Sequence, residues 1–155
     1  RDRSVSRGLG DVYKRQTHMY NYVNRPWRTQ ELVDSVLYNQ YFNAPDGLSG
    51  NEDCGQMSAW YILNSMGFYQ VCPGKPVYSI GRPLFEEVTI NLPDRKTFVI
   101  RTHNNSKTNK YIESVLLNGK PLDVPFFTHD DLVRGGTMEI TMSPVPTEWG
   151  KQVKN

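Results

Sequence analysis

The chain has 155 residues, of which 37% are hydrophobic and 22% are charged, and its formal net charge at pH 7 is +2. This apolar content is enough for a packed core and argues against an intrinsically disordered chain. The balanced charge, without a basic stripe, argues against a nucleic-acid partner, and no apolar run approaches the ~18 residues of a membrane span.

The first 16 residues differ from the rest of the chain. They hold five basic and two acidic residues and show no helical or strand periodicity, whereas a regular, aromatic pattern begins at Thr17. The segment resembles translated sequencing-adapter sequence at the ends of metagenomic reading frames. We therefore interpret residues 1–16 as a non-native prefix, with a genuine basic tail as the alternative, and exclude them from the fold prediction.

Residues 17–70 are predicted to be mainly helical. Residues 19–23 have the pattern of the end of a helix. A second helix is expected to begin at Pro26, because proline is tolerated in the first helical turn, and to end near Phe42 or Asn43. Its apolar residues recur at helical spacing: Leu32, Val33, Val36, Leu37 and Tyr41.

A loop rich in Pro, Asp and Gly is predicted at residues 44–50. A third helix is expected at about residues 55–66, because Gly67 stands where a helix C-cap belongs. Short helices need tertiary packing to be stable. Both helices should therefore pack against other parts of the protein.

Residues 71–155 are predicted to form short antiparallel strands. The expected strands are rich in β-branched and aromatic residues: Val77–Ile80, Leu84–Leu92, Thr97–Thr102, Tyr111–Leu117 and Thr137–Met142. Asn118-Gly119 indicates a hairpin between Leu117 and Pro121. Thr128 is expected to cap a short helical turn.

Three adjacent polar residues, Asn51, Glu52 and Asp53, lie on a glycine-flanked loop just before the third helix. Such a loop is a plausible site, but the spacing of Asp53 and Gln56 also fits a capping box. In both interpretations the helix N-terminus favours the ionised carboxylate. Asp53 is therefore suited to be a general base or a cation ligand rather than a general acid.

Three stretches carry a more specific pattern. Residues 47–61 read GLSGNEDCGQMSAWY, residues 20–30 read YNYVNRPWRTQ and residues 128–144 read THDDLVRGGTMEITMSP. The first is similar to the segment G-L/I-S/P-G-N/D-E/D-D-x-G-Q-M-S-A-W of glycoside hydrolase family 92, the calcium-dependent exo-α-mannosidases. The second is similar to the family's YNYAGxPWKTQ, and the third has the family's style. The resemblance covers roughly residues 17–150.

This resemblance implies inverting hydrolysis of terminal α-mannosides, as in N-glycan degradation. Asp53 would be the general base, and Asn51 would orient the attacking water. Glu52, Gln56 and Trp60 would contact the substrate, with helix packing as the alternative for Trp60 and the cap for Gln56. Inversion also needs a general acid, about 6.5–9.5 Å from the base. The family's acid has no match in this sequence, so the chain alone is expected to be inactive.

For the fold, the resemblance implies that residues 17–70 are the last helices of an (α/α)6 barrel. Residues 71–155 would be a small antiparallel β unit beside it. The implied cofactor is Ca2+, with most ligands upstream and none assigned here. The implied partners are a mannose-terminated glycan and the missing N-terminal part of the same protein, which would be periplasmic, cell-surface or secreted in a bacterium. The alternative from another class is a non-catalytic carbohydrate-binding or packing module.

The two cysteines, Cys54 and Cys72, are too few for a disulfide framework. They are interpreted as two separate, small buried residues. A disulfide between them would require an oxidising compartment, and the sequence leaves this pairing open.

Overall fold

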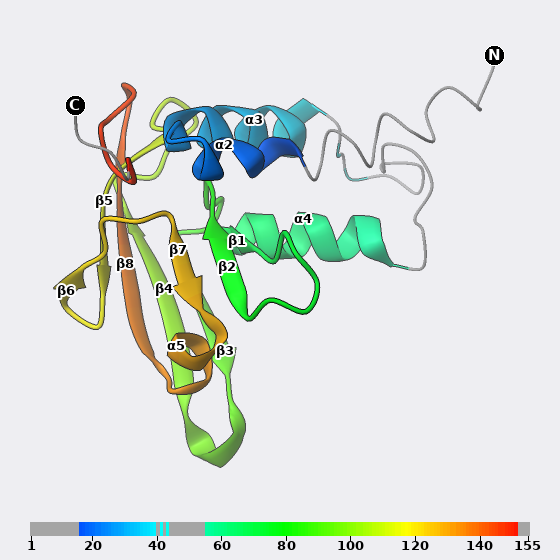
Figure 1. Ribbon diagram of the computed structural model, residues 1–155, viewed down its shortest axis with the longest axis vertical. Coiled ribbons are helices and arrows are strands. Elements are labelled where there is room, and N and C mark those ends of the chain that lie inside the picture. The colour runs from blue at the N-terminus through cyan, green and yellow to red at the C-terminus, as the bar shows by residue number, and fades with distance from the viewer. Residues whose placement is uncertain (1–15, 40, 42, 44–54, 152–155) are drawn as a thin grey trace.

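The computed structural model describes residues 16–39, 41, 43 and 55–151. A helical part comes first in the chain and lies beside a β part that is made of two sheets (Figure 1). The predicted order, helices first and strands afterwards, is confirmed.

The helical part contains α2 (Met19–Tyr22), α3 (Pro26–Asn39) and α4 (Gln56–Met66). α3 begins at the predicted proline, and it ends at Asn39 rather than near Phe42 or Asn43. The predicted C-cap of α4 is confirmed, because Gly67 has a φ of 108° and its backbone N–H bonds to the last carbonyls of the helix. This left-handed conformation is one that glycine adopts without a steric penalty.

The start of α4 differs from the capping-box interpretation. Its N-cap residue is Gly55, with a φ of 86°, which has no side chain to cap the helix. A capping box between Asp53 and Gln56 would require Asp53 at the N-cap, so that interpretation does not describe this helix. The side chain of Asp53 itself lies outside the described residues.

α3 and α4 share a small apolar core. Val33, Val36, Leu37 and Trp60 are buried together, and Tyr41, Tyr61, Tyr69 and Leu84 pack against them. The helical spacing in α3 therefore identified the face that is buried.

The strands form two sheets, and Figure 1 shows β2 and β7 of one sheet in front of β4 and β8 of the other. The three-stranded sheet has the order β1 (Phe68–Tyr69), β2 (Val77–Ile80), β7 (Phe126–Thr128). The five-stranded sheet has the order β3 (Glu87–Asn91), β4 (Thr97–His103), β8 (Gly136–Ser143), β5 (Tyr111–Leu117), β6 (Lys120–Pro121).

The prediction of a wholly antiparallel β unit is wrong for one pair of strands. β4 and β8 are parallel, with Phe98 opposite Gly136 and His103 opposite Thr141. The other pairs among the described strands are antiparallel. A parallel pair needs a long crossover connection, and here β5, β6, β7 and α5 (His129–Val133) lie between the two strands in sequence.

Two local predictions in the β part are confirmed. Asn118 and Gly119 both have positive φ, 52° and 78°, and they join β5 to β6 in a tight hairpin. The Thr128 hydroxyl accepts a hydrogen bond from the Asp131 backbone N–H, and the Asp131 carboxylate accepts one from the Thr128 backbone N–H. This reciprocal capping box starts α5.

The main core lies between the two sheets. In β4, buried residues alternate with exposed ones, as expected for a sheet with one face in the core and the other in solvent. The buried cluster contains Phe68, Ile80, Phe98, Ile100, Ile112, Val115, Phe127, Leu132, Met138, Ile140, Met142 and Trp149.

Candidate functional site

The residues predicted to carry the chemistry, Asn51, Glu52 and Asp53, lie outside the described residues. Their roles therefore remain predictions. The structure does describe α4, which starts at Gln56, and the contacts that hold it. Because α4 directly follows the predicted site in sequence, the contacts that hold α4 bear on that site.

Gln56 and Trp60 are the two predicted substrate-binding residues that the structure describes. Gln56 is half-buried in the first turn of α4. Trp60 is only 1% exposed, and its ring is stacked on that of Tyr41, with centroids 5.9 Å apart and an interplanar angle of 7°. Packing accounts for Trp60 here, and a contact of either residue with substrate remains a prediction.

A buried polar network connects α4 to α2 and β2. His18, which directly precedes α2, is 0% exposed. Its Nε2 lies 2.7 Å from Asn64 Oδ1 on α4, and its Nδ1 lies 2.9 Å from Ser79 Oγ on β2. Asn21 Nδ2 donates to the same Ser79 Oγ at 2.7 Å. Side chains from α2, α4 and β2 are therefore joined in one network with this imidazole.

Burial lowers the pKa of His18 from 6.5 to about 4, although the hydrogen bond with Asn64 acts in the opposite direction. The imidazole is therefore neutral at physiological pH. Sequence reasoning missed this residue, because a single histidine beside a short helix carries no pattern that distinguishes a buried position from an exposed one.

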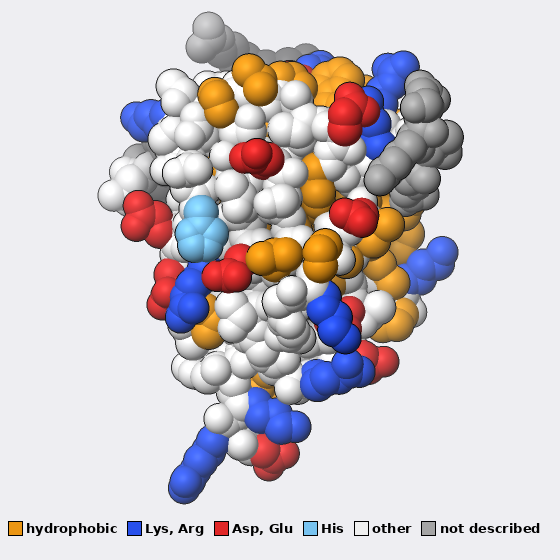
Figure 2. All heavy atoms as spheres, turned by 90° about the vertical axis from the view of Figure 1, so that its left-hand side faces the viewer, with side chains coloured by type: hydrophobic (Ala, Val, Ile, Leu, Met, Phe, Trp, Pro, Cys, Tyr) orange, Lys and Arg blue, Asp and Glu red, His pale blue; other side chains and the backbone are white. Residues whose placement is uncertain are grey.

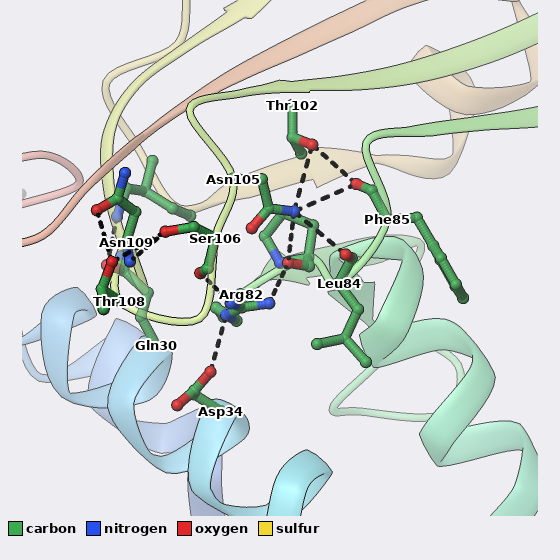
Figure 3. Close-up of polar contacts among 12 residues, drawn as sticks. Gln30, Asp34, Arg82, Leu84, Phe85, Thr102, Asn105, Ser106, Thr108 and Asn109 are labelled. Carbon is green, nitrogen blue, oxygen red and sulfur yellow. Dashed lines mark hydrogen bonds and ion pairs between the residues drawn. The ribbon is translucent and has the colours of Figure 1, made fainter.

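A second buried junction connects α3 to the β part (Figure 3). Arg82 is 1% exposed, and its Nε lies 2.8 Å from Asp34 Oδ1. The carboxylate oxygen lies off the N–H direction, so this contact is an ion pair rather than a hydrogen bond. The other guanidinium nitrogens donate to the carbonyls of Pro83 and Ser106, each at 2.8 Å. Figure 3 shows Arg82 between α3 and the loop that carries Asn105 and Ser106.

The two charged side chains at this junction differ in exposure, which is 1% for Arg82 and 15% for Asp34. Desolvation raises the pKa of Asp34, although the positive charges of Arg82 and Lys110 act to lower it. Desolvation is therefore the larger effect on this carboxyl group, even beside two cations. The junction is a structural clamp between α3 and the β part.

Two further side chains of α3 bond to β5. Gln30 Oε1 accepts the backbone N–H of Ile112 at 2.8 Å, and the Tyr111 hydroxyl donates to the Glu31 carboxylate. Burial raises the pKa of Tyr111 to about 12, assisted by this hydrogen bond. Burial alone would raise the pKa of Glu31, but the hydrogen bonds from Tyr111 and Arg28 lower it.

The polar residues of the sequence YNYVNRPWRTQ are therefore partly explained by packing. Its Asn21, Thr29 and Gln30 are buried, whereas its Tyr22 and Val23 are 49% and 59% exposed. Sequence alone did not separate these structural residues from catalytic ones, because buried polar side chains look the same in a motif.

Two hollows open on the surface of the described residues. One, of about 580 Å³, is lined by Gln16, Thr17, Met19, Tyr20, Arg28, Leu32 and Val36. The other, of about 290 Å³, is lined by Gln70, Gly74, Lys75, Pro76, Tyr78 and His129. Neither contains a residue that the sequence assigned to the substrate.

The implied Ca2+ has no cluster of acidic or soft ligands among the described residues. No group of three or more His, Cys, Asp or Glu side chains within them could hold a metal ion. Cys72 is exposed and has a free thiol, so the prediction that it is buried is wrong, and Cys54 lies outside the described residues. Within these residues, no helix has the length and apolar character that crossing a bilayer requires.

The outer face of the five-stranded sheet bears on the alternative of a carbohydrate-binding module. Its exposed side chains include Glu87, Arg101 and His103, with Arg101 Nε 2.9 Å from a Glu87 oxygen. Figure 2 shows charged and hydrophobic side chains interspersed on the side where β5, β6 and β8 lie. Sugar-binding platforms use aromatic rings, and the outward residues of β3, β4 and β8 include none.

Comparison with known proteins gives a consistent result. Residues 14–144 match the profile of the glycosyl hydrolase family 92 catalytic domain. The matched range begins inside the segment 1–16 and includes the Asn51–Asp53 loop. The interpretation of residues 1–16 as a prefix remains a prediction.

Solved structures and a curated protein are similar to the same region. The family GH92 inverting mannosidase of Bacteroides thetaiotaomicron VPI-5482 is 40% identical, with a TM-score of 0.87 over 95% of this chain and 20% of its own. A family GH92 alpha-mannosidase of Bacteroides thetaiotaomicron is 37% identical, with a TM-score of 0.81 over 87% of this chain and 18% of its own. A protein of Arthroderma benhamiae, described as an uncharacterized secreted glycosidase, is 33% identical over 86% of this chain and 18% of its own. The chain spans about a fifth of the length of these relatives.

Proposed function

The chain belongs to glycosyl hydrolase family 92, and from this premise we propose that it is part of an exo-α-mannosidase that acts on terminal α-mannosides of glycans. The observation that carries the proposal is the family match over residues 14–144, which contains the Asn51–Asp53 loop. The 40% identity to a protein described as an inverting mannosidase supports it.

In the proposed mechanism, Asp53 is the general base that takes a proton from the attacking water, and Asn51 orients that water. α4 begins three residues after Asp53, and the unpaired N–H groups and positive dipole of a helix N-terminus favour an ionised carboxylate nearby. The general acid belongs to another part of the protein, about 6.5–9.5 Å from the base, which leaves room for the water.

We also propose that the complete enzyme depends on Ca2+, which would hold the mannose hydroxyls and help to distort the ring. Most of its ligands are expected in other segments of the protein, and the steps assigned to this chain involve only its own side chains.

The helices are proposed to belong to an (α/α)6 barrel that the rest of the protein completes. Apolar side chains remain exposed on all three helices, including Met19 at 49%, Tyr38 at 46% and Ile62 at 56%. Helices that are apolar on several faces are typical of positions between other helices. A location outside the cytoplasm is proposed by analogy with the relative described as secreted.

The test uses the full-length parent protein, with Asp53→Asn as the variant and Asp130→Asn as its control. Asp130 is an exposed acid on α5, so its change should leave turnover unaltered. Loss of a general base should lower kcat on α-mannosides by about 10²–10⁴-fold. Proton NMR of the first turnovers should show β-mannose, as inversion requires. Equal activity of the two variants, or α-mannose as the first product, would refute the mechanism.

A further inference from the structure

The hydrogen bonds around His18 fix where its proton lies. Asn64 Nδ2 donates to the carbonyl of Trp60 at 2.9 Å, so Asn64 Oδ1 faces the imidazole and must accept from Nε2–H. In a neutral imidazole, Nδ1 is then an acceptor, and it receives the hydroxyl hydrogen of Ser79. The Ser79 oxygen in turn accepts from Asn21 Nδ2. Each donor in this network thus meets an acceptor.

A second proton on His18 would disrupt this arrangement. At Nδ1 it would remove the acceptor of the Ser79 hydroxyl hydrogen, and it would put a full charge at a position with 0% exposure. Uncompensated buried charges are costly.

No neighbouring charge compensates for that proton among the described residues. The ring of Tyr69 on β1 lies 5.7 Å from the imidazole, between centroids, and is the titratable group that faces it. From the other elements the imidazole bonds to Asn64 of α4 and Ser79 of β2 and lies beside Gly81, next to which Val33 of α3 also lies, and none of these side chains ionises. The network therefore works only with a neutral histidine.

We propose that neutral His18 is a positioning residue of the catalytic unit: it holds α4 against α2 and β2, and protonation in acid releases this hold. The part of the inference that concerns turnover rests on the proposed role of Asp53. The hold itself rests on hydrogen bonds between side chains that lie 46 and 61 residues apart in the sequence.

Two substitutions separate the two halves of the imidazole. In His18→Gln the amide nitrogen can reach the position of Nε2 and donate to Asn64, and an amide does not titrate in this pH range. In His18→Asn the shorter amide reaches only the position of Nδ1, so the bond to α4 is lost. His103→Gln is the matched control, because His103 is an exposed histidine on β4 that takes no part in this network.

The experiment measures kcat and KM of the full-length protein on an α-mannoside between pH 4 and 7. His18→Asn should lower kcat by about 10–10²-fold at every pH with little change in KM, because small displacements of a catalytic group cost this much. His18→Gln should keep kcat near pH 7 and lose less activity than the wild type toward pH 4. If both variants follow the wild-type and His103→Gln profiles, the inference is wrong.

Hydrogen exchange of the α4 backbone provides a readout that needs no activity. Exchange should accelerate as the pH falls toward 4, after correction for the intrinsic rate, in the wild type and in His103→Gln but not in His18→Gln. If no variant has mannosidase activity, the proposed function fails and exchange still decides this inference. If His18→Asn does not fold, Asn64→Ala removes the same bond from the α4 side and should give the same fall in kcat. Unaltered α4 exchange across this pH range would overturn the proposal.

Discussion

Asp34→Asn tests the clamp between α3 and the β part. The substitution is nearly isosteric and removes the counter-ion of Arg82, a side chain with 1% exposure. Removing one partner of a buried ion pair costs about 3–5 kcal/mol, because the remaining charge is uncompensated. We expect the lower end, about 3 kcal/mol, because Arg82 keeps its hydrogen bonds to the carbonyls of Pro83 and Ser106.

The measurement is native-state hydrogen exchange in the full-length protein, followed at residues 105–112. The Ile112 amide is a direct reporter, since its N–H is bonded to Gln30 of α3. A loss of about 3 kcal/mol corresponds to exchange on the order of 10²-fold faster, if opening of this junction is local.

The matched control is Glu87→Gln, which removes the counter-ion of Arg101 on the exposed face of the sheet. Those two side chains are 56% and 49% exposed, and exposed ion pairs contribute little to stability. We expect no measurable change in exchange. If Asp34→Asn also leaves exchange at residues 105–112 within twofold of the wild type, the clamp does not hold α3 on the β part and the reasoning fails.

The remaining predictions concern pH, backbone conformation and activity. The folded pKa of His18, about 4, lies below its ordinary value of 6.5, so the unfolded state binds more protons between these two pH values. The free energy of unfolding should therefore fall by on the order of 3 kcal/mol as the pH falls through this window. In thermal unfolding, His18→Gln should remove most of this dependence of stability on pH. Gly67→Ala should lower the free energy of unfolding by about 1–2 kcal/mol because of the left-handed φ, and further because the new Cβ would lie 3.1 Å from Pro83 Cβ. Gly74→Ala has a similar φ but open space around the new Cβ, so it should lower the free energy of unfolding through the φ alone. The purified 155-residue chain should release no mannose from α-mannosides, and release at a rate comparable to the full-length enzyme would contradict the assignment of the general acid to another segment.

Sequence reasoning succeeded where the determinant of structure is local. Gly67 ends α4, Asn118-Gly119 turns the β5–β6 hairpin and Thr128 caps α5, and each depends on a few neighbouring residues. It failed at the start of α4, where the spacing of Asp53 and Gln56 satisfied the capping pattern but Gly55 holds the cap position. A pattern of two residues is consistent with more than one helix start.

Long-range features could not be predicted in this way. The parallel pairing of β4 with β8 depends on the path of the chain between them rather than on either strand's composition. Arg82 is preceded by Gly81 and followed by Pro83 and has no periodic context, so nothing in the sequence indicates that its guanidinium is fully buried against Asp34, 48 positions earlier. Long charged side chains are usually exposed, so an exposed Arg82 would be expected from the sequence, whereas in the structure it is buried.

The two buried junctions change how the family's motifs should be interpreted. Asn21 and Gln30 belong to a motif that identifies the family, yet in the structure they bond to Ser79 and to the Ile112 backbone. These bonds hold the helices on the β part, and α4 is held in turn through His18. The β part therefore contributes to the proposed site without supplying a reacting group, because it fixes the helix that follows Asp53. On this argument, substitutions at Ser79 should alter turnover through α4, whereas substitutions on the outer face of the five-stranded sheet should not.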